Sequence, residues 1–304
     1  MFVSLVFAAA LGQQVVIPLG KNPPKVERPI APIETAGPAF AATCKGSEDD
    51  WEKRAPPVRI HANVYLVGTC GISSILITGT DGHILIDGGT EAGAELIAEN
   101  IRRLGFKLTD VKYLLHSHEH FDHVGGIARL QQLTGAELVA SADAARVFQT
   151  GAAGSGDPQA GMHGPFPAAR VDRVIKDGEA VRLGNLSLTA AATPGHTPGA
   201  LSWHWGSCDG GVCRQIVYAD SLSPISRDDY RFSDHPAYFA AFRTSLRKVA
   251  ALDCDILLTP HPSASNMSAR MAGKAALTDT EACRNYAAVK SKALDERLAT
   301  EAKK

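Results

Sequence analysis

The sequence predicts an α/β fold in which two mixed β-sheets pack face to face with helices outside them, a four-layer αββα sandwich. Two observations lead to this prediction. Runs that alternate or stay apolar, which are typical of strands, gather in two parts of the chain, at 58–89 and at 177–220. Segments with helical spacing are interleaved with these strand-rich halves and follow them. The apolar faces of both sets of strands can be buried if the two sheets face each other and the helices cover their outer faces.

The first half predicts a hairpin followed by alternating helices and strands. "VRIHANVYLVGT" (58–69) and "SSILITGTDGHILIDGG" (73–89) are expected as hairpin strands that turn at "TDG". "EAGAELIAENIRRLG" (91–105) has helical spacing and a glycine stop at Gly105. The next elements are expected to be a buried strand at 111–117, a helix at 125–135, a strand at 136–141 and a helix at 142–151.

The second half begins after a glycine-rich loop at 151–167. It is expected to contain strands within 177–193, 200–205 and 214–220, a helix at 236–252, a strand at 255–261 and a C-terminal helix from about 277. No short-period repeat interrupts this order, so one continuous domain is predicted from residue 43 to residue 304.

Composition fits an ordinary globular protein and argues against charged partners. Of the 304 residues, 45% are hydrophobic, which is enough for a sizeable core. The 31 Lys plus Arg and 32 Asp plus Glu give a formal charge of −1, and no basic run of five or more occurs. Nucleic acid and membrane surfaces are therefore not expected as partners.

Residues 1–42 are interpreted as a signal peptide or extended N-terminal arm. "FVSLVFAAAL" (2–11) has the length of a signal-peptide hydrophobic region and is too short to span a bilayer. No Lys or Arg precedes it, so a buried first strand remains the alternative. Small-residue cleavage candidates lie at 8–10 and 39–42. The segment between them is rich in proline, which disfavours helix and sheet: Pro18, Pro23, Pro24, Pro29, Pro32 and Pro38.

The six cysteines are consistent with an exported protein that forms disulfides, and the prediction is a secreted or periplasmic location. They allow 15 pairings, and none forms a C-x-x-C motif. Cys208 and Cys213 flank the turn sequence "DGGV", which can bring them within bridging distance. Reduced thiols in a cytosolic protein are the alternative.

The stretch "HSHEHFDH" (116–123) places several metal-binding side chains at the end of a predicted strand, where α/β sheets hold ligands. His118 and His120 are two apart and can face one ion from an extended segment. Asp122 and His123 follow where the chain turns toward the next helix, which suits a second ion nearby. Two further histidines follow predicted strand ends on proline-containing loops, His196 in "TPGHTPG" and His261 in "LLTPHPSASN".

These residues divide into two ligand sets, and imidazole and carboxylate without thiolate favour zinc, with Mn, Fe or Co as alternatives. The register H-x-H-x-D-H, "TPGHTPG" and the late "TPHP" histidine resemble the metallo-β-lactamase superfamily. The resemblance extends over about 51–266, and it includes "NVYLVGT", "ILIDGG" with Asp87, and "YADSLS" at 218–223. Serine in "YADSLS", "TPHPSASN" and cysteines around the last strand and helix resemble subclass three (B3) of the class B β-lactamases.

The resemblance implies a fold, a cofactor and roles for individual residues. It implies two Zn²⁺ ions per chain, one on His118, His120 and His196, the other on Asp122, His123 and His261. Ser221 and Ser223 would bind the substrate carboxylate. The implied disulfides are Cys254–Cys283 and Cys208–Cys213, which leaves Cys44–Cys70.

The activity implied is that of a secreted β-lactamase that confers antibiotic resistance. A hydroxide shared by two zinc ions would open the amide bond of penicillins, cephalosporins and carbapenems. Asp122 would orient this nucleophile, and Ser221 would bind rather than attack, because no acyl-enzyme is needed. The partner is then a small molecule, and a monomer is expected. The alternative is another hydrolase of this fold, a lactonase or thioesterase; a metal-binding protein without catalysis would be expected to lack ligands.

Other polar residues have plainer interpretations. His116 is expected at the strand end, Glu119 as a solvated or supporting group, and Asp87 as a support for a metal ligand or a turn cap. Asp220 in "ADSL" could instead bridge two metals, as in thioesterase-like relatives of the fold. His163, in the glycine-rich loop, is a candidate for lining the site.

Overall fold

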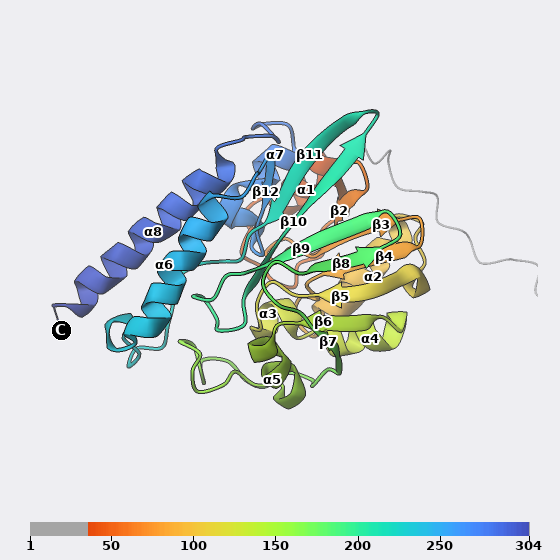
Figure 1. Cartoon of the computed structure of the whole chain (residues 1–304). Helices are drawn as coiled ribbons and strands as arrows, with labels where there is room; N and C mark the ends of the chain where they lie inside the picture. Colours follow the sequence, from red (N-terminus) through yellow and green to blue (C-terminus); the bar gives the residue numbers. More distant parts are fainter. Residues whose placement is uncertain (1–35, 304) are drawn as a thin grey trace, which may run out of the picture.

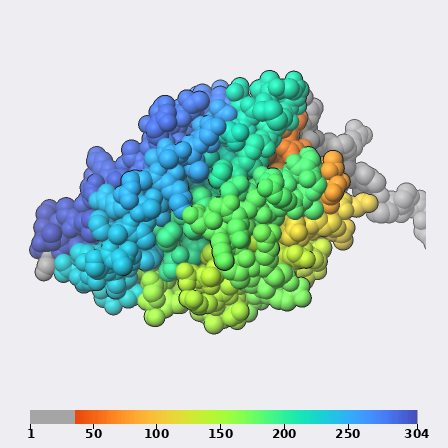
Figure 2. Space-filling model, in the orientation of Figure 1, coloured from red at the N-terminus to blue at the C-terminus, as the bar shows by residue number. Residues whose placement is uncertain are grey.

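The structure is a computed structural model that describes residues 36–303. The predicted signal sequence at 2–11 and most of the proline-rich segment lie outside the described residues. Figure 1 shows two sheets with helices on both sides, and Figure 2 shows the C-terminal helices forming one end of the molecule. No helix within 36–303 is both long and apolar enough to cross a bilayer.

The first sheet has seven strands in chain order. Neighbours are antiparallel from β1 to β4 and parallel from β4 to β7. The strands are β1 (Val58–His61), β2 (Val64–Leu66), β3 (Ile75–Gly79), β4 (Gly82–Ile86), β5 (Val111–Leu115), β6 (Glu137–Ala140) and β7 (Val171–Val174).

The second sheet has five strands in the order β12-β11-β10-β9-β8. Only β11 and β12 are parallel; the other neighbours are antiparallel. The strands are β8 (Ala180–Leu183), β9 (Leu186–Ala192), β10 (Leu201–Asp209), β11 (Val212–Tyr218) and β12 (Ile256–Leu258).

Apolar side chains from both sheets form the central core, in which Ile84 and Ile86 of β4 pack with Trp203 of β10 and Ile216 of β11. A second cluster lies between the first sheet and α2 (Gly93–Arg103), α4 (Ile127–Thr134) and α5 (Ala142–Thr150). A third lies between the second sheet and α6 (Pro236–Ala250) and α8 (Ala282–Glu301). These three apolar layers confirm the predicted αββα sandwich of two mixed sheets.

Three helices and one strand were not expected from the sequence. Helix α1 (Ala36–Cys44) begins inside the segment interpreted as an extended arm, and its Phe40 and Cys44 are buried in the core. Pro38 is tolerated there because the first helical turn needs no backbone N–H bonds. The one-turn helix α3 (Phe121–Val124) and α7 (Met267–Met271) are too short to show a period, and β7 is a half-exposed edge strand with charged residues.

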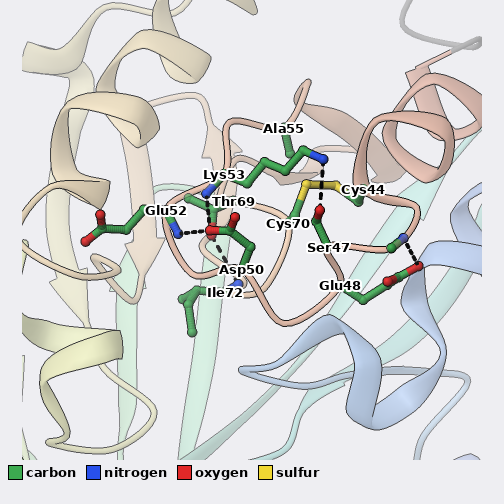
Figure 3. Close-up of a disulfide and its surroundings, with 12 residues drawn as sticks. Cys44, Ser47, Glu48, Asp50, Glu52, Lys53, Ala55, Thr69, Cys70 and Ile72 are labelled. Atoms are coloured by element: carbon green, nitrogen blue, oxygen red, sulfur yellow. Dashed lines mark hydrogen bonds between the residues drawn. A yellow bond between two sulfur atoms is a disulfide. The ribbon is translucent and has the colours of Figure 1, made fainter.

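Three disulfides join Cys44 to Cys70, Cys208 to Cys213, and Cys254 to Cys283. These are the pairs that the resemblance implies. The first ties α1 to the loop after β2, beside Ser47, whose hydroxyl accepts a hydrogen bond from Lys53 Nζ at 3.0 Å (Figure 3). The second closes the β10–β11 hairpin, and the third links the start of β12 to α8.

We predict that the third disulfide contributes more to stability than the hairpin disulfide. Chain-entropy arguments give about 3 to 4 kcal/mol for the 29-residue separation of Cys254 and Cys283, against about 2 kcal/mol for the 5-residue separation of the hairpin pair. Chemical unfolding of the two double Cys→Ala variants, both in the metal-free state, measures the difference. Equal losses of unfolding free energy would contradict the prediction.

Candidate metal centre

Five histidines from three parts of the chain meet at the carboxyl ends of β4 and β5. Strand β5 ends at Leu115, and the chain continues without regular secondary structure, with a bend at Ser117, before α3 carries Asp122 and His123. The ring of His118 lies centrally, with ring centroids 5.0 Å from His120, 4.6 Å from His196 and 4.3 Å from His123. The His261 ring lies 4.8 Å beyond that of His123.

The candidate ligand atoms form two adjoining groups. Atoms of His118, His120 and His196 all lie within 4.8 Å of one another. Those of His118, Asp122 and His123 also do so, which makes His118 common to both groups. His261 joins the second group, because its Nε2 lies 3.2 Å from His123 Nε2 and 3.5 Å from Asp122 Oδ2.

In four of these histidines, one ring nitrogen contacts an acceptor outside the centre. The other ring nitrogen is then the one that can bind a metal ion. Such contacts select the tautomer and fix the ring of a metal-binding histidine. The pairs are His118 Nδ1 to Asp220 Oδ1 at 2.8 Å, His120 Nε2 to Asp157 Oδ2 at 3.2 Å, His196 Nδ1 to the Ser223 carbonyl at 2.9 Å, and His261 Nδ1 to the Gly71 carbonyl at 3.2 Å.

The fifth histidine, His123, faces Asp87 from a longer distance. Its Nδ1 lies 3.7 Å from Asp87 Oδ2, and its Nε2 lies 3.1 Å from Asp122 Oδ2. Asp87 itself accepts hydrogen bonds from the Ser117 backbone and hydroxyl and from Tyr218 Oη. This arrangement agrees with the predicted supporting role of Asp87.

Buried charge at this centre calls for a cation. Five carboxylates are buried here, and within 36–303 none pairs with Lys or Arg: Asp87, Glu119, Asp122, Asp157 and Asp220. Buried charges are normally paired or bind metals, since an isolated one is costly. In addition, His118 Nε2 is buried without a hydrogen-bond partner in the described part of the chain. The donor set and this charge fit metal ions.

Burial sets the protonation states of three imidazoles. It lowers the pKa of His118 and of His196 well below the ordinary value, and repulsion from neighbouring imidazoles lowers each pKa further. Burial likewise lowers the pKa of His261 to about 4. These rings are therefore neutral near pH 7, which is the form that binds metal. For Asp122, burial raises the pKa, but the charge of His123 outweighs this and the pKa falls below its usual range.

The comparison with known proteins is consistent with this geometry. A family model described as "Metallo-beta-lactamase superfamily" matches residues 67–261, well over half of the chain. The chain belongs to this superfamily. The solved structure of the MIM-2 metallo-beta-lactamase is 55% identical, with a TM-score of 0.84, and the match covers 88% of this chain and 98% of that one.

Further relatives separate into two kinds. MEM-A1, a subclass B3 metallo-beta-lactamase isolated from a soil metagenome library, is 45% identical with a TM-score of 0.80, covering 83% of this chain and 99% of that one. It confirms the resemblance to subclass three. Curated relatives match over shorter stretches. A probable metallo-hydrolase of Burkholderia pseudomallei (strain 1710b) is 31% identical over 44% of this chain, and the match spans only 48% of that protein. A hydroxyacylglutathione hydrolase of Methylobacterium nodulans is 36% identical over 35% of this chain and 32% of that protein.

Within this metallo-beta-lactamase fold, Asp220 lies behind His118, a candidate ligand. Its Oδ1 accepts from His118 Nδ1, and its Oδ2 accepts from the Leu222 backbone N–H at 3.3 Å. Both oxygens are therefore engaged with protein groups. The geometry favours an orienting role for Asp220 over the bridging role that the sequence left open.

Two residues of the histidine-rich stretch point away from the centre. His116 Nε2 accepts from the Ser141 backbone N–H at 3.2 Å, and burial lowers the His116 pKa to about 3. Glu119 is buried rather than solvated, and it accepts from Thr197 Oγ1 and the Gly199 N–H at 2.6 and 2.7 Å. Glu119 thereby holds the loop that carries His196, which is the supporting alternative of the two expected.

The sequence missed Asp157 and Gln159, which come from the glycine-rich loop at 151–167. Asp157 contacts His120, and Gln159 Nε2 lies 3.5 Å from His196 Nε2. From the sequence, only the length and glycine content of this loop indicated that it lies near the site. The residue selected from it on that basis was His163. The His163 ring lies against Phe121, with centroids 4.8 Å apart, and 6.3 Å from the His120 ring, and it lines a small pocket together with His120 and Gln159.

Close backbone packing brings the strand end and the ligand-bearing turn together. The Gly88 N–H donates to the His123 carbonyl at 2.7 Å, and the Gly126 N–H donates to the Gly89 carbonyl at 3.0 Å. A Cβ on Gly126 would lie 2.3 Å from the Gly88 oxygen. The glycines of "IDGG" and "HVGG" therefore permit the contact that holds His123 in place.

We predict that Asp220→Asn weakens metal binding about 10- to 100-fold, the range typical when a histidine ligand loses its charged partner. A neutral amide is a weaker acceptor for His118 Nδ1 than a carboxylate. Competition with a chromogenic chelator measures the affinity. Asp177→Asn is the matched control, because Asp177 pairs with Lys248 on the surface. Equal metal affinity in both variants would refute an orienting role for Asp220.

Proposed function

We propose that the chain is a zinc-dependent β-lactamase that opens the amide bond of penicillins, cephalosporins and carbapenems and confers antibiotic resistance. The observation that carries the proposal is the complete ligand set in a chain 55% identical to the MIM-2 metallo-beta-lactamase over 88% of its length. The proposed ligands of one Zn²⁺ are His118, His120 and His196, and those of the other are Asp122, His123 and His261.

The residues around the two proposed metal sites have distinct tasks. When bound, zinc supplies Lewis acidity toward the substrate carbonyl and lowers the pKa of water to about 7. The Asp122 carboxylate stays ionised and is the proposed acceptor that orients the attacking water. Asp220, Asp157 and the Ser223 carbonyl hold the first three imidazoles in their metal-binding tautomers.

Substrate binding is assigned to Ser221 and Ser223, which follow β11. The Ser221 hydroxyl oxygen is buried and has no hydrogen-bond partner within 36–303. An unpaired buried hydroxyl costs stability unless a ligand satisfies it. This favours binding of a substrate group at Ser221.

A thioesterase acting on glutathione conjugates is the second candidate, because hydroxyacylglutathione hydrolases are among the curated relatives. The match to them spans about a third to three fifths of those proteins, whereas that to MIM-2 spans 98% of its chain. The contact of Asp220 with His118 also argues for the β-lactamase.

The location and assembly of the protein belong to the same proposal. Three disulfides support an oxidising compartment, and we infer export to the periplasm or beyond it. We also propose that residues 1–42 act as the export signal and arm, with the part after Ala36 folding onto the enzyme as α1. The partner is a small-molecule β-lactam, and a monomer suffices because one chain supplies every proposed ligand.

We predict that the zinc-loaded protein hydrolyses a chromogenic cephalosporin and a carbapenem, and that a chelator abolishes both activities until zinc is restored. Absorbance assays with two equivalents of zinc measure both reactions. Hydrolysis of a glutathione thioester or a lactone instead, with no β-lactam turnover, would transfer the assignment to the second candidate.

We predict that His196→Ala lowers kcat/KM for these substrates by more than the roughly 10- to 100-fold typical when only the partner of a ligand is lost, because the loop would no longer supply a ligand to the first site. His204→Ala is the matched control, since His204 lies on β10 with no ligand among its contacts. Metal content by elemental analysis should fall in the first variant alone. Near-normal turnover by His196→Ala with full metal content would contradict the assignment.

A further inference from the structure

Lys290 of α8 places an ammonium group beside the proposed substrate-binding serines. Its ammonium donates to Ser223 Oγ at 2.8 Å and lies 5.2 Å from the centre of the Tyr286 ring. The side chain is half-buried, and within 36–303 no carboxylate lies within 4.0 Å of Nζ. By contrast Lys292, on the same helix, is exposed and pairs with Glu296 at 3.8 Å.

The same helix fixes the backbone that carries the two serines. Tyr286 Oη donates to the Asp220 and Ser221 carbonyls at 2.9 and 2.8 Å. The Ser223 carbonyl in turn accepts from His196 Nδ1 at 2.9 Å. Lys290 therefore reaches a segment that contacts the candidate metal centre on its other side.

An ammonium ion has three donors, and Ser223 accepts from one of them. The Ser221 hydroxyl, two residues away, is buried and has no hydrogen-bond partner in the described part of the chain. Asp220 is the buried carboxylate whose charge acts on this ammonium, and it lies outside ion-pair distance. The Ser223 hydroxyl donates to the Ser221 carbonyl at 3.3 Å, so the Ser221 hydroxyl is the donor left beside the cation. Such a hydroxyl next to an ammonium with two remaining donors forms a site for a carboxylate, because a charge-assisted hydrogen bond is roughly twice as strong as a neutral one.

We propose that Lys290 is the specificity-determining residue that binds the carboxylate of anionic substrates, together with Ser221 and Ser223. This inference rests on the proposed β-lactamase function and adds the source of charge at its substrate site. Ser221 and Ser223 are neutral, so they can bind an ester or an amide as well as an acid. Lys290 makes the site prefer the anion.

Two consequences distinguish this role from that of a structural contact between α8 and the serine segment. Removal of the charge weakens binding of the acid and leaves an uncharged ester unaffected. Salt weakens binding of the acid to the native enzyme, because the partly exposed charge is screened. Loss of a purely structural contact would change both substrates alike.

The test compares Lys290→Gln and Lys290→Arg with the control Lys292→Gln, using a penicillin and its methyl ester as substrates of the zinc-loaded full chain. Lys290→Gln should raise KM for the acid about 10- to 100-fold, as expected from loss of a hydrogen bond to a charged group, with kcat nearly unchanged. Its kinetics with the ester should match those of the native enzyme. Lys290→Arg should restore most of the affinity, and Lys292→Gln should behave as native.

Three results would overturn the inference. An unchanged KM of Lys290→Gln for the acid would remove Lys290 from the site, and an equal rise for acid and ester would reduce it to a structural contact. Zinc content and thermal unfolding of each variant show whether the fold is retained, and Lys290→Arg keeps the test valid if Lys290→Gln unfolds. A native enzyme that hydrolyses no β-lactam would overturn the proposed function and this inference together, which distinguishes it from the first two results.

Discussion

The buried carboxylate of Asp87 is the contact on which the candidate centre depends, because it joins both sheets behind the proposed metal ligands. It follows β4 of the first sheet and accepts from Tyr218 Oη, at the end of β11 in the second sheet, at 2.6 Å. It also accepts from the Ser117 N–H at 2.6 Å, which fixes the start of the histidine-rich stretch. Its φ of 65° is unusual for a residue other than glycine, and such strain persists where surrounding contacts enforce it.

This arrangement couples metal binding to folding. Burying Asp87 raises the pKa of its carboxyl group, and burial raises the pKa of Asp220 to about 7. The native state therefore carries carboxylates whose ionisation is unfavourable without nearby cations. Metal ions at the imidazoles would stabilise these ionised forms, and their binding energy would add to the stability of the fold. The centre is thus costly for the metal-free chain and stabilising for the loaded one.

Local patterns were sufficient to predict the ligand candidates, because each follows a strand end within a few residues. His118, His120, Asp122 and His123 share one stretch, and His196 and His261 lie on proline-containing loops, so strand prediction alone brought them together. Of the partners that orient them, Asp87 and Glu119 were expected as supports, and the others could not be predicted. Asp157 contacts His120, and Lys290 contacts Ser223, only because tertiary packing brings them together. Helix α1 was also not predicted, because its sequence has too little helical periodicity.

The turn at 220–223 makes the metal and substrate groups interdependent. Leu222 has a φ of 47°, and this turn directs Asp220 to His118 and the Ser223 carbonyl to His196. The same turn presents the two serine hydroxyls, and Tyr286 holds it from α8. A shift of the turn would therefore move two candidate metal-binding imidazoles and the proposed carboxylate site at once. Because the turn is hydrogen-bonded on both sides, the substrate carboxylate that we propose to bind there would meet groups already positioned relative to the candidate metal centre.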